Sequence, residues 1–438
     1  MSNKNLYFNL INKIENDSIN IGIIGLGYVG LPLAYYFSKK FKVFGFDTSL
    51  NVCKKINNGK STLKHISDQH VNEAKKKGFK AYSKFNEIKN CDVVIICVPT
   101  PLNKNREPDL SYIDNTLKNI EKYIRKNQII CLESTTYPGT TRERILPFIQ
   151  RNGFNVGKDY FLAYSPERED PANKNFNTST IPKVVGGFSE KCKNIAKKIY
   201  GKIINRVVTV SSTDAAEMTK LLENIHRCVN ISLVNEMKII CSKMNININE
   251  VIDAAATKPF GFVPYYPGPG LGGHCIPIDP FYLTWKAREY NVDARFIEIA
   301  GQVNSMMPEW VLENVSKALN TVGKNFSTSK ILIIGLAYKK NIEDIRESPS
   351  IEIFKRLYKL KSKISYHDPY VAKFPKNRNF QINSKSIKLS SANIKKNNLT
   401  LILTDHDIID WENIKKNSNL IVDTRNVYKQ KSKKIFKS

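Results

Sequence analysis

The sequence predicts an α/β fold in which two Rossmann-like domains, each with a doubly wound parallel sheet, are joined by a long central helix. Short, continuously apolar runs alternate with longer lysine-rich segments in two regions of the chain, which is typical of parallel strands covered by helices on both faces. Ile331–Tyr338 resembles Ile21–Tyr28, so the two regions are expected to share one fold. The 438 residues allow two to three domains at roughly 150 residues each.

The first α/β region is expected to span residues 19–211, after an N-terminal arm or loose helix at residues 1–18. Its strands are predicted from apolar runs that are bounded by polar, lysine-rich segments. These runs are residues 21–24, 42–46, 93–98, 129–132, 160–163 and 184–185. The segments between them are expected to be the helices that a parallel sheet requires as crossovers.

A change near Ser212 predicts a central helical domain at residues 212–320. Asp214 and Glu217 have the spacing of a capping box at a helix start. Apolar residues at helical spacing then predict a helix as far as about Met244. They are Met218, Leu221, Leu222, Ile225, Val229, Leu233 and Met237. Further helix is expected around 249–256 and from 279 to 317.

The second α/β region is expected to cover residues 321–438, with its first strand beginning at Lys330. Ala337 and Lys340 stand where the first region has Gly27 and Gly30. The later glycines are needed for close approach of a pyrophosphate and for helix–strand packing. Only the first region therefore keeps the dinucleotide fingerprint.

Composition excludes several classes of protein. A hydrophobic fraction of 41% and an aromatic fraction of 10% exclude a largely disordered chain. The net charge of +28 comes from lysines scattered among asparagines and isoleucines, so we expect no nucleic-acid partner. The longest uncharged stretch, Ile21–Ser38, holds four glycines and a proline and is too short for a membrane helix. None of the eight cysteines forms a CxxC pair. We expect a reduced, cytoplasmic protein without a metal site or a membrane anchor.

The segment Gly25–Gly30 is a GxGxxG turn between a predicted strand and a predicted helix. The first glycine allows the tight turn, the second admits a pyrophosphate, and the helix start offers free N–H donors. The cofactor contacts expected in this turn are Gly25, Gly27, Tyr28, Val29 and Gly30.

Asp47, 22 residues after Gly25, ends the next predicted strand and is expected to accept hydrogen bonds from the adenosine ribose. A carboxylate there repels a 2′-phosphate, so NAD is favoured over NADP. Thr100 and Thr135 follow two further strands of the same sheet, and both are expected near the cofactor, Thr135 closest to the chemistry. Ordinary turn chemistry explains these threonines about equally well.

The stretch Pro267–Cys275 holds four glycines and two prolines before a histidine and a cysteine. Such a loop brings backbone amides close to a ligand and presents a thiol, so Cys275 is a candidate nucleophile. A metal site at His274 and Cys275 is disfavoured, because adjacent residues are awkward ligands. Lys220 and Asn224 share a helix face and are either a solvated surface or groups that orient water and stabilise an oxyanion.

Several motifs in one order give the chain a resemblance to a known family. It resembles the UDP-sugar 6-dehydrogenases of the UDP-glucose/GDP-mannose dehydrogenase family over about residues 21–425. The motifs are Gly25–Gly30, Glu133-Ser134-Thr135, Ser165-Pro166-Glu167, Glu217–Asn224, Gly272-Gly273-His274-Cys275, Tyr338-Lys339-Lys340 and Arg346-Glu347-Ser348.

The resemblance implies a four-electron oxidation of a sugar primary alcohol to a carboxylate with two NAD, through a thiohemiacetal and a thioester on Cys275. It implies that Lys220 and Asp279 assist proton transfer or position water and that Asn224 holds the oxyanion. It also implies that Glu167 is the acid near the reacting centre, with Thr135 holding a water beside it.

For the nucleotide-sugar, the resemblance implies contacts from Glu167, Lys220 and Asn224 and from four further positions. These are Tyr265, Gly272, Lys339 and Arg425. Arg346 also matches a family position and is expected to contact the cofactor. A structural role would explain this arginine equally well. The second α/β region would bind UDP and not a dinucleotide.

The loop from Lys258 to Cys275 resembles the branch of the family that oxidises N-acetylated UDP-hexosamines, with UDP-N-acetylglucosamine favoured. UDP-glucose, UDP-N-acetylmannosamine and UDP-N-acetylgalactosamine remain alternatives, because one substituent changes binding by only about 1–3 kcal/mol. The resemblance also implies a homodimer through the central helix and a role in supplying surface-polysaccharide precursors. A single-step 3-hydroxyacyl or hydroxyacid dehydrogenase is the alternative from another class, and would need neither Cys275 nor a second α/β region.

Overall fold

The computed structural model describes residues 3–63, 66–103, 105–169, 176–273, 276–375, 382–430 and 432–438. The chain forms two compact units, each built from two separate segments. The first unit is Met1–Glu223 with Phe281–Val292, and the second is Asn224–Pro280 with Asp293–Ser438.

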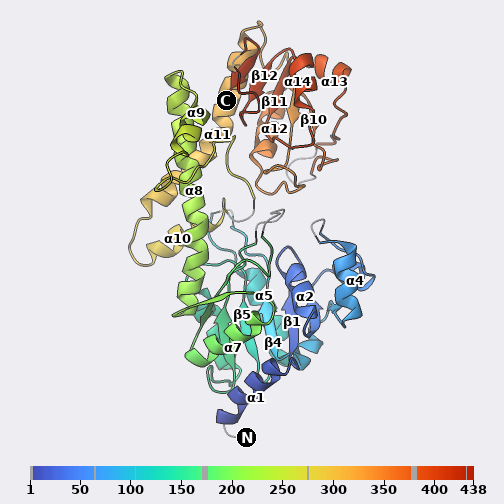
Figure 1. Cartoon of the computed structure of the whole chain (residues 1–438), viewed down its shortest axis with the longest axis vertical. Helices are drawn as coiled ribbons and strands as arrows, with labels where there is room; N and C mark the ends of the chain where they lie inside the picture. Colours follow the sequence, from blue (N-terminus) through green and yellow to red (C-terminus); the bar gives the residue numbers. More distant parts are fainter. Residues whose placement is uncertain are drawn as a thin grey trace. The chain divides into compact units, whose positions relative to one another are not determined.

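The first unit contains an eight-stranded sheet with the order β3-β2-β1-β4-β5-β6-β7-β8, drawn in blue to green in Figure 1. The strands are β1 (Asn20–Ile24), β2 (Lys42–Phe46), β3 (Lys80–Tyr82), β4 (Val93–Ile96), β5 (Ile129–Leu132), β6 (Phe161–Tyr164), β7 (Lys183–Gly187) and β8 (Val207–Val210). All neighbours run parallel except β6 and β7, which are antiparallel. The central strands are buried on both faces, which explains their continuously apolar sequences.

Helices and short 3-10 turns connect these strands. They are α1 (Asn3–Glu15), α2 (Gly30–Ser38), α3 (Leu50–Asn57), α4 (Asp68–Lys76), η1 (Asn86–Asn90), α5 (Ser111–Ile120), η2 (Glu121–Tyr123), the π-helical turn η3 (Thr141–Ile145), α6 (Leu146–Arg151) and α7 (Glu190–Gly201). Serines at positions 49, 67 and 189 cap α3, α4 and α7 by accepting a bond from an N–H three residues on. These caps satisfy donors that a helix start leaves open.

The helix α8 (Thr213–Lys243) begins in the first unit and ends in the second. Its end agrees with the predicted limit near Met244. The predicted capping box of Asp214 and Glu217 is wrong. The Ser212 hydroxyl caps the helix by accepting from the Ala215 N–H at 3.1 Å, and the Glu217 carboxylate accepts from the N–H groups of Gly139 and Thr141. The helix α10 (Asp279–Arg288) begins in the second unit and ends in the first.

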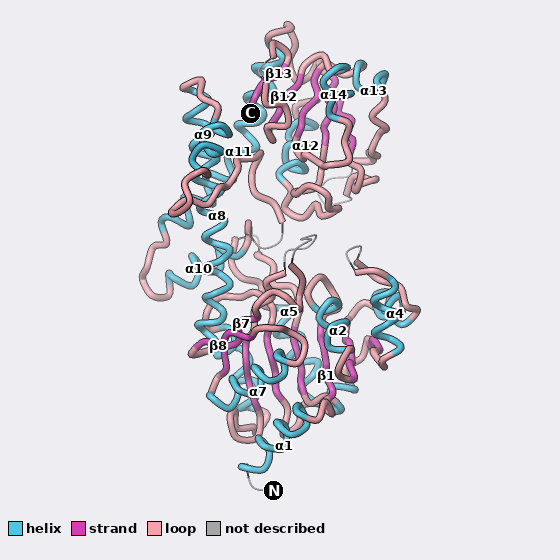
Figure 2. The backbone as a smooth tube through the Cα atoms, in the orientation of Figure 1, coloured by secondary structure: helices cyan, strands magenta, loops and turns pink. Residues whose placement is uncertain are grey.

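The second unit contains a five-stranded parallel sheet with the order β10-β9-β11-β12-β13. The strands are β9 (Lys330–Ile334), β10 (Lys363–His367), β11 (Leu399–Ile402), β12 (Ile421–Asp423) and β13 (Ile435–Lys437), and Figure 2 shows them in magenta. The helices are α9 (Ile248–Ala255), α11 (Arg295–Asn320), α12 (Pro349–Lys359), α13 (Ser391–Lys395) and α14 (Trp411–Asn417). Ile331 and Ile333 pack with α11 and α12, while Leu332 and Ile334 pack with α13 and α14.

The predicted fold class is confirmed, with two Rossmann-like sheets and a long central helix. Two details differ from expectation. The predicted strand at 184–185 is β7, which runs against its neighbour β6, and the following β8 was not predicted. The helix expected at 279–317 is two helices, α10 and α11. In the described part of the chain, no helix is both long and apolar enough to cross a membrane.

Candidate active site

The turn after β1 has the geometry that a pyrophosphate requires. Gly25 takes a φ of +91°, and its N–H donates to the Phe46 carbonyl at 2.8 Å. A Cβ at Gly25 would lie 2.6 Å from the Cys97 carbonyl oxygen, and one at Gly30 would lie 1.9 Å from the Gly25 carbonyl oxygen. At Gly27 a Cβ would meet nothing within 4 Å, so this backbone is open to a ligand beside the start of α2. The turn therefore fits an NAD pyrophosphate.

Asp47 follows β2, the strand next to the glycine turn. Its Oδ2 accepts from the Leu26 N–H at 3.1 Å, and its Oδ1 accepts from the Ser49 N–H at 2.9 Å. Each carboxylate oxygen can accept a further bond, and the side chain is half-buried, so a ribose hydroxyl can still bind. The remaining predicted turn residues are Tyr28, which is 36% exposed, and Val29, the residue before α2.

The loops after β4 and β5 meet through Thr100 and Thr135. The Thr100 hydroxyl donates to the Thr135 carbonyl at 2.6 Å, and Thr100 is buried. The Tyr282 hydroxyl on α10 donates to the Thr100 carbonyl. Thr100 therefore holds the backbone of the Thr135 loop, whereas the half-buried Thr135 side chain remains a candidate to hold water.

Glu167 belongs to a buried cluster that the sequence did not reveal, here called the Lys183 cluster: Lys183, Glu133, Glu167 and Tyr200. The Lys183 ammonium lies 2.7 Å from Glu133 Oε2 and 3.1 Å from Glu167 Oε2. The Tyr200 hydroxyl donates to Glu133 Oε1 at 2.5 Å. The only available sequence signal was a lysine at the start of an apolar strand, where burial demands a partner.

The two carboxyl groups of the cluster differ in their electrostatics. Burial, together with the nearby Glu167 charge, raises the pKa of Glu133 and outweighs the opposing effect of Lys183. Burial also acts on Glu167, but the Lys183 ammonium and two backbone N–H donors outweigh it and lower the pKa of Glu167. The pKa of Lys183 itself is raised, because the two carboxylates outweigh the opposing effect of burial.

The first turns of α8 are fastened to the site loops. Glu217 Oε2 accepts from the Gly139 N–H at 2.6 Å, and its Oε1 accepts from the Thr141 N–H at 2.9 Å and hydroxyl at 2.6 Å. Burial raises the pKa of Glu217 to about 7. One turn later, the buried Lys220 side chain has no hydrogen-bond or ion-pair partner among the residues that the structure describes. Glu223 accepts two bonds from Arg168, next to Glu167.

In the second unit, two predicted catalytic residues are in contact. Asn224 on α8 donates through Nδ2 to Asp279 Oδ2 at 2.5 Å, and Asp279 is 2% exposed. These residues are 55 positions apart in the sequence, so the contact is a product of the fold. Cys275, with His274, lies outside the described residues.

The glycine-rich loop packs at the carboxyl edge of the five-stranded sheet. The Gly268 N–H donates to Asn235 Oδ1 at 2.9 Å, and a Cβ at Gly268 would lie 2.6 Å from an Arg425 guanidinium nitrogen. A Cβ at Gly272 would lie 2.4 Å from the Tyr338 Cβ. At Gly272 only glycine allows this approach, and the loop brings the predicted Gly272 and Arg425 into one region.

Three further predicted residues lie in this unit. The Tyr265 hydroxyl is 3.3 Å from His226 Nδ1. Lys339 follows Tyr338 in the loop after β9 and is half-buried. Arg346 forms an ion pair with Asp344 at 2.6 Å, and its carbonyl accepts from the Gly273 N–H at 2.9 Å, so it has a clear structural role.

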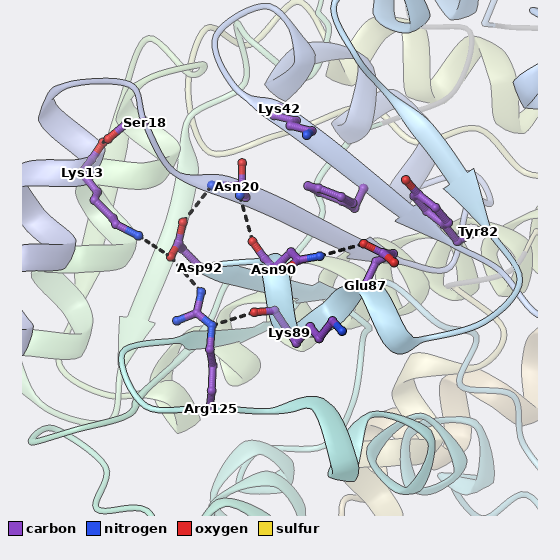
Figure 3. A pocket seen from close by; sticks show the side chains of 11 residues that line it. Lys13, Ser18, Asn20, Lys42, Tyr82, Glu87, Lys89, Asn90, Asp92 and Arg125 are labelled. Carbon is purple, nitrogen blue, oxygen red and sulfur yellow. Dashed lines mark hydrogen bonds and ion pairs between the residues drawn. The ribbon is translucent and has the colours of Figure 1, made fainter.

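A separate hollow of about 460 Å³ lies at the amino ends of β1, β2 and β4, opposite the glycine turn of the same sheet. Its base is Asp92, which is 3.0 Å from both Lys13 and Arg125, as Figure 3 shows. The Asn20 N–H also donates to Asp92. All these groups have partners, and parallel sheets bind ligands at the other edge, so this hollow is not part of the candidate active site.

Three family models of the UDP-glucose/GDP-mannose dehydrogenase family match the chain. The NAD binding domain matches residues 19–204, the central domain 214–306 and the UDP binding domain 332–430. UDP-N-acetyl-D-glucosamine 6-dehydrogenase of Salmonella typhi is 36% identical over 81% of this chain and 83% of that protein. The chain belongs to the UDP-glucose/GDP-mannose dehydrogenase family. It is therefore an NAD-dependent oxidoreductase, a UDP-sugar dehydrogenase with a UDP binding domain.

Other members of the family match the dehydrogenase over almost its whole length. UDP-N-acetyl-D-mannosamine dehydrogenase of Pyrococcus horikoshii is 31% identical over 94% of this chain and 96% of its own. The solved structure of the UDP-D-ManNAc dehydrogenase from that organism has a TM-score of 0.86, with 31% identity over 96% of this chain and 99% of the other.

Proposed function

We propose that the dehydrogenase oxidises the 6-hydroxyl of a UDP-N-acetylhexosamine, with UDP-N-acetylglucosamine preferred, to the uronic acid. The observation that carries this proposal is that one chain holds both an open dinucleotide turn, in its first unit, and a glycine-rich loop at the carboxyl edge of its second sheet. The Salmonella typhi relative, whose name specifies UDP-N-acetyl-D-glucosamine, supports the sugar.

Cys275 is the proposed nucleophile. NAD held at the Gly25–Gly30 turn would supply the acceptor for the hydride that leaves C6 in each of the two oxidations. The first oxidation gives the aldehyde. The Cys275 thiolate adds to the aldehyde carbon as the carbon–oxygen π bond opens, and the oxygen takes up a proton to give a thiohemiacetal, which still carries a hydrogen on C6. The second oxidation gives a thioester. Water then adds to its carbonyl carbon, the carbon–sulfur bond breaks, and the products are the carboxylate and the free thiol.

Lys220, Asn224 and Asp279 are the proposed proton-handling and orienting groups. Asn224 uses one amide hydrogen on Asp279, which leaves its second hydrogen for an oxyanion on C6. Asp279 thereby fixes the orientation of the amide and is placed to accept a proton from water. Lys220 is buried, so its ammonium is suited to stabilise a developing negative charge.

The remaining predicted positions are assigned to binding. Glu167 and Thr135 hold the water that attacks the thioester. The residues proposed for the nucleotide-sugar are Tyr265, Gly272, Lys339 and Arg425. Arg346 is proposed as a cofactor contact in addition to its pairing with Asp344. The product would serve as a uronic-acid precursor of surface polysaccharide.

We further propose a homodimer formed through α8. This helix carries large apolar side chains that are 36–64% exposed, which is unusual for a helix of an isolated chain. They are Met218, Leu222, Leu233, Met237 and Ile240, and Met244 follows directly after the helix. Sedimentation of the purified protein tests this, and a monomer would contradict it.

The first experiment measures NADH formed per sugar consumed, with excess NAD and four substrates in parallel. These are the UDP derivatives of N-acetylglucosamine, N-acetylmannosamine, N-acetylgalactosamine and glucose. Two NADH per UDP-N-acetylglucosamine, with turnover lost in Cys275→Ser, is the expected result. One NADH per sugar, with Cys275→Ser fully active, would contradict the thioester scheme and favour a single-step dehydrogenase.

A further inference from the structure

We infer that Lys183 is a positioning residue for Glu167: it fixes this carboxylate and keeps it ionised, so that Glu167 serves as a hydrogen-bond acceptor and base and not as a proton donor. This inference rests on the proposed function, and it changes the role of acid that the sequence suggested for Glu167. Lys183 acts through Glu167.

The hydrogen bonds of Glu167 carry the argument. Its Oε1 accepts from the backbone N–H groups of Arg168 and Glu169, both at 2.7 Å. Its Oε2 accepts from the Lys183 ammonium at 3.1 Å. Backbone N–H and ammonium groups can only donate, so three donors face this carboxyl group and no acceptor does. The donor set therefore favours the carboxylate over the acid.

Glu133 is the matched contrast within the Lys183 cluster. Its side chain is fully buried, whereas that of Glu167 is 14% exposed. Besides Lys183, its partner is the Tyr200 hydroxyl, which can either donate or accept. Two carboxylates around one ammonium leave one net negative charge in a buried place, which is costly. A proton that enters the cluster is therefore expected on Glu133.

The groups that face the cluster from neighbouring elements do not replace Lys183. Burial raises the pKa of the Cys97 thiol, directly after β4, and of the Cys131 thiol on β5, so both are neutral. The Arg168 guanidinium binds Glu223. The Glu169 carboxyl, whose pKa is raised by burial, accepts from Thr178. Within the described ranges, Lys183 is the one cationic side chain in contact with Glu133 and Glu167.

Asp92, at the opposite end of the sheet, offers a matched control (Figure 3). There one buried carboxylate is held by two cations, Lys13 and Arg125, whose side chains are 39% and 37% exposed. Asp92→Asn disturbs a buried ion cluster of similar size, far from the proposed chemistry. It is expected to lower stability without changing the pH dependence of turnover.

The experiment compares Lys183→Met, Lys183→Arg and Asp92→Asn with the wild-type enzyme. In Lys183→Met the acid limb of the kcat–pH profile should rise by about one pH unit or more, equivalent to a tenfold change in proton affinity. Lys183→Arg should restore the wild-type limb, because arginine keeps a positive charge. Asp92→Asn should leave the acid limb of the kcat–pH profile at its wild-type position. An unchanged limb in folded Lys183→Met would overturn the inference.

Infrared spectra of protein with isotope-labelled glutamate supply a readout that needs no sugar oxidation. Bands assigned to Glu167 by difference with Glu167→Gln should be those of a carboxylate between about pH 5 and about pH 8. A protonated Glu167 in this range contradicts the inference even if the enzyme oxidises UDP-sugars. Carboxylate bands that persist to lower pH in the wild type than in Lys183→Met support it even if none of the sugars is oxidised, and the proposed function then fails alone.

If Lys183→Met does not fold, Glu133→Gln replaces it. That variant leaves the whole ammonium charge to Glu167, so the acid limb should stay or move to lower pH. A limb that moves to higher pH would show that Glu133, and not Lys183, governs the ionisation of Glu167.

Discussion

The first turns of the two sheets use the same backbone device and differ in the carboxylate beside it. The Gly25 N–H donates to Phe46 at 2.8 Å and the Gly335 N–H to His367 at 2.9 Å, and both glycines have positive φ. Asp47 accepts one N–H of its turn and is half-buried. Asp368 accepts two, from Leu336 and Ala337, and is 2% exposed.

His406 adds a further hydrogen bond to Asp368, beside the turn of the second sheet. Its Nδ1 accepts from the Asn341 N–H at 3.0 Å, so its Nε2 carries the hydrogen that faces Asp368 Oδ2 at 3.2 Å. Burial opposes ionisation, but the His406 and backbone donors outweigh it and lower the pKa of Asp368 to about 2. The carboxylate at this position thus keeps acceptor positions open to a ligand in the first sheet and has a structural role in the second.

Gly27→Val offers the strongest test of this comparison. A side chain at Gly27 meets open space, so the fold should tolerate it, while NAD affinity should fall by about 100-fold or more because the pyrophosphate needs that space. NAD titration and thermal unfolding measure the two effects. Ala337→Gly, at the matching position of the second sheet, should leave NAD affinity unchanged. Tight NAD binding by Gly27→Val would contradict the conclusion that the open space at Gly27 is what admits the pyrophosphate.

Asp368→Asn should affect stability. Each carboxylate oxygen accepts from two backbone N–H groups, Oδ2 from residues 336 and 337 and Oδ1 from residues 370 and 371. In either orientation an amide would therefore face two donors with its NH2 group, which is expected to cost about 2–4 kcal/mol of unfolding free energy. Since the pKa of Asp368 is lowered to about 2, its contribution is present above the unfolded pKa and is lost as pH falls. Urea unfolding should show a loss of roughly 2 kcal/mol between about pH 4 and about pH 2, and this component should vanish in the variant.

Asp47→Asn should have the smallest effect and should appear in ligand binding. Losing the charged ribose acceptor should raise the NAD Kd by about tenfold, and the preference over NADP should shrink because the repulsion of a 2′-phosphate is removed. The unfolding free energy should change by less than about 1 kcal/mol, because the side chain is half-buried and water can replace its bonds. A large loss of unfolding free energy would show that Asp47, like Asp368, mainly stabilises the fold.

Local motifs were predictable because a few adjacent residues determine their geometry. The turn at Gly25–Gly30, the end of α8 and the repeat of the first sheet in the second were each read from nearby residues. Side-chain partners were not, because they come from distant segments. The capping-box spacing of Glu217 gave no sign of its bond to Gly139, 78 residues away.

The Lys183 cluster and the direction of β7 share this limitation. Glu133, Glu167 and Lys183 stand in three separate segments, and only the sheet order brings β5, β6 and β7 together. An apolar strand reads the same in either direction, so the antiparallel pairing of β6 and β7 had no signature in composition. The contact between Asn224 and Asp279 likewise could not be predicted from the sequence, because only the fold brings these two residues together.

The path of α10 constrains how the first unit can form during synthesis. Its Tyr282 is fully buried against the Thr100 loop, and Lys286 forms an ion pair with Glu143 at 2.8 Å. Both residues are synthesised more than seventy residues after the end of β8. The first unit therefore stays incomplete until about sixty residues beyond Glu223 have been added. A shortened protein that stops at Glu223 would lack them, so a free-standing cofactor domain has to be built with α10 grafted back on.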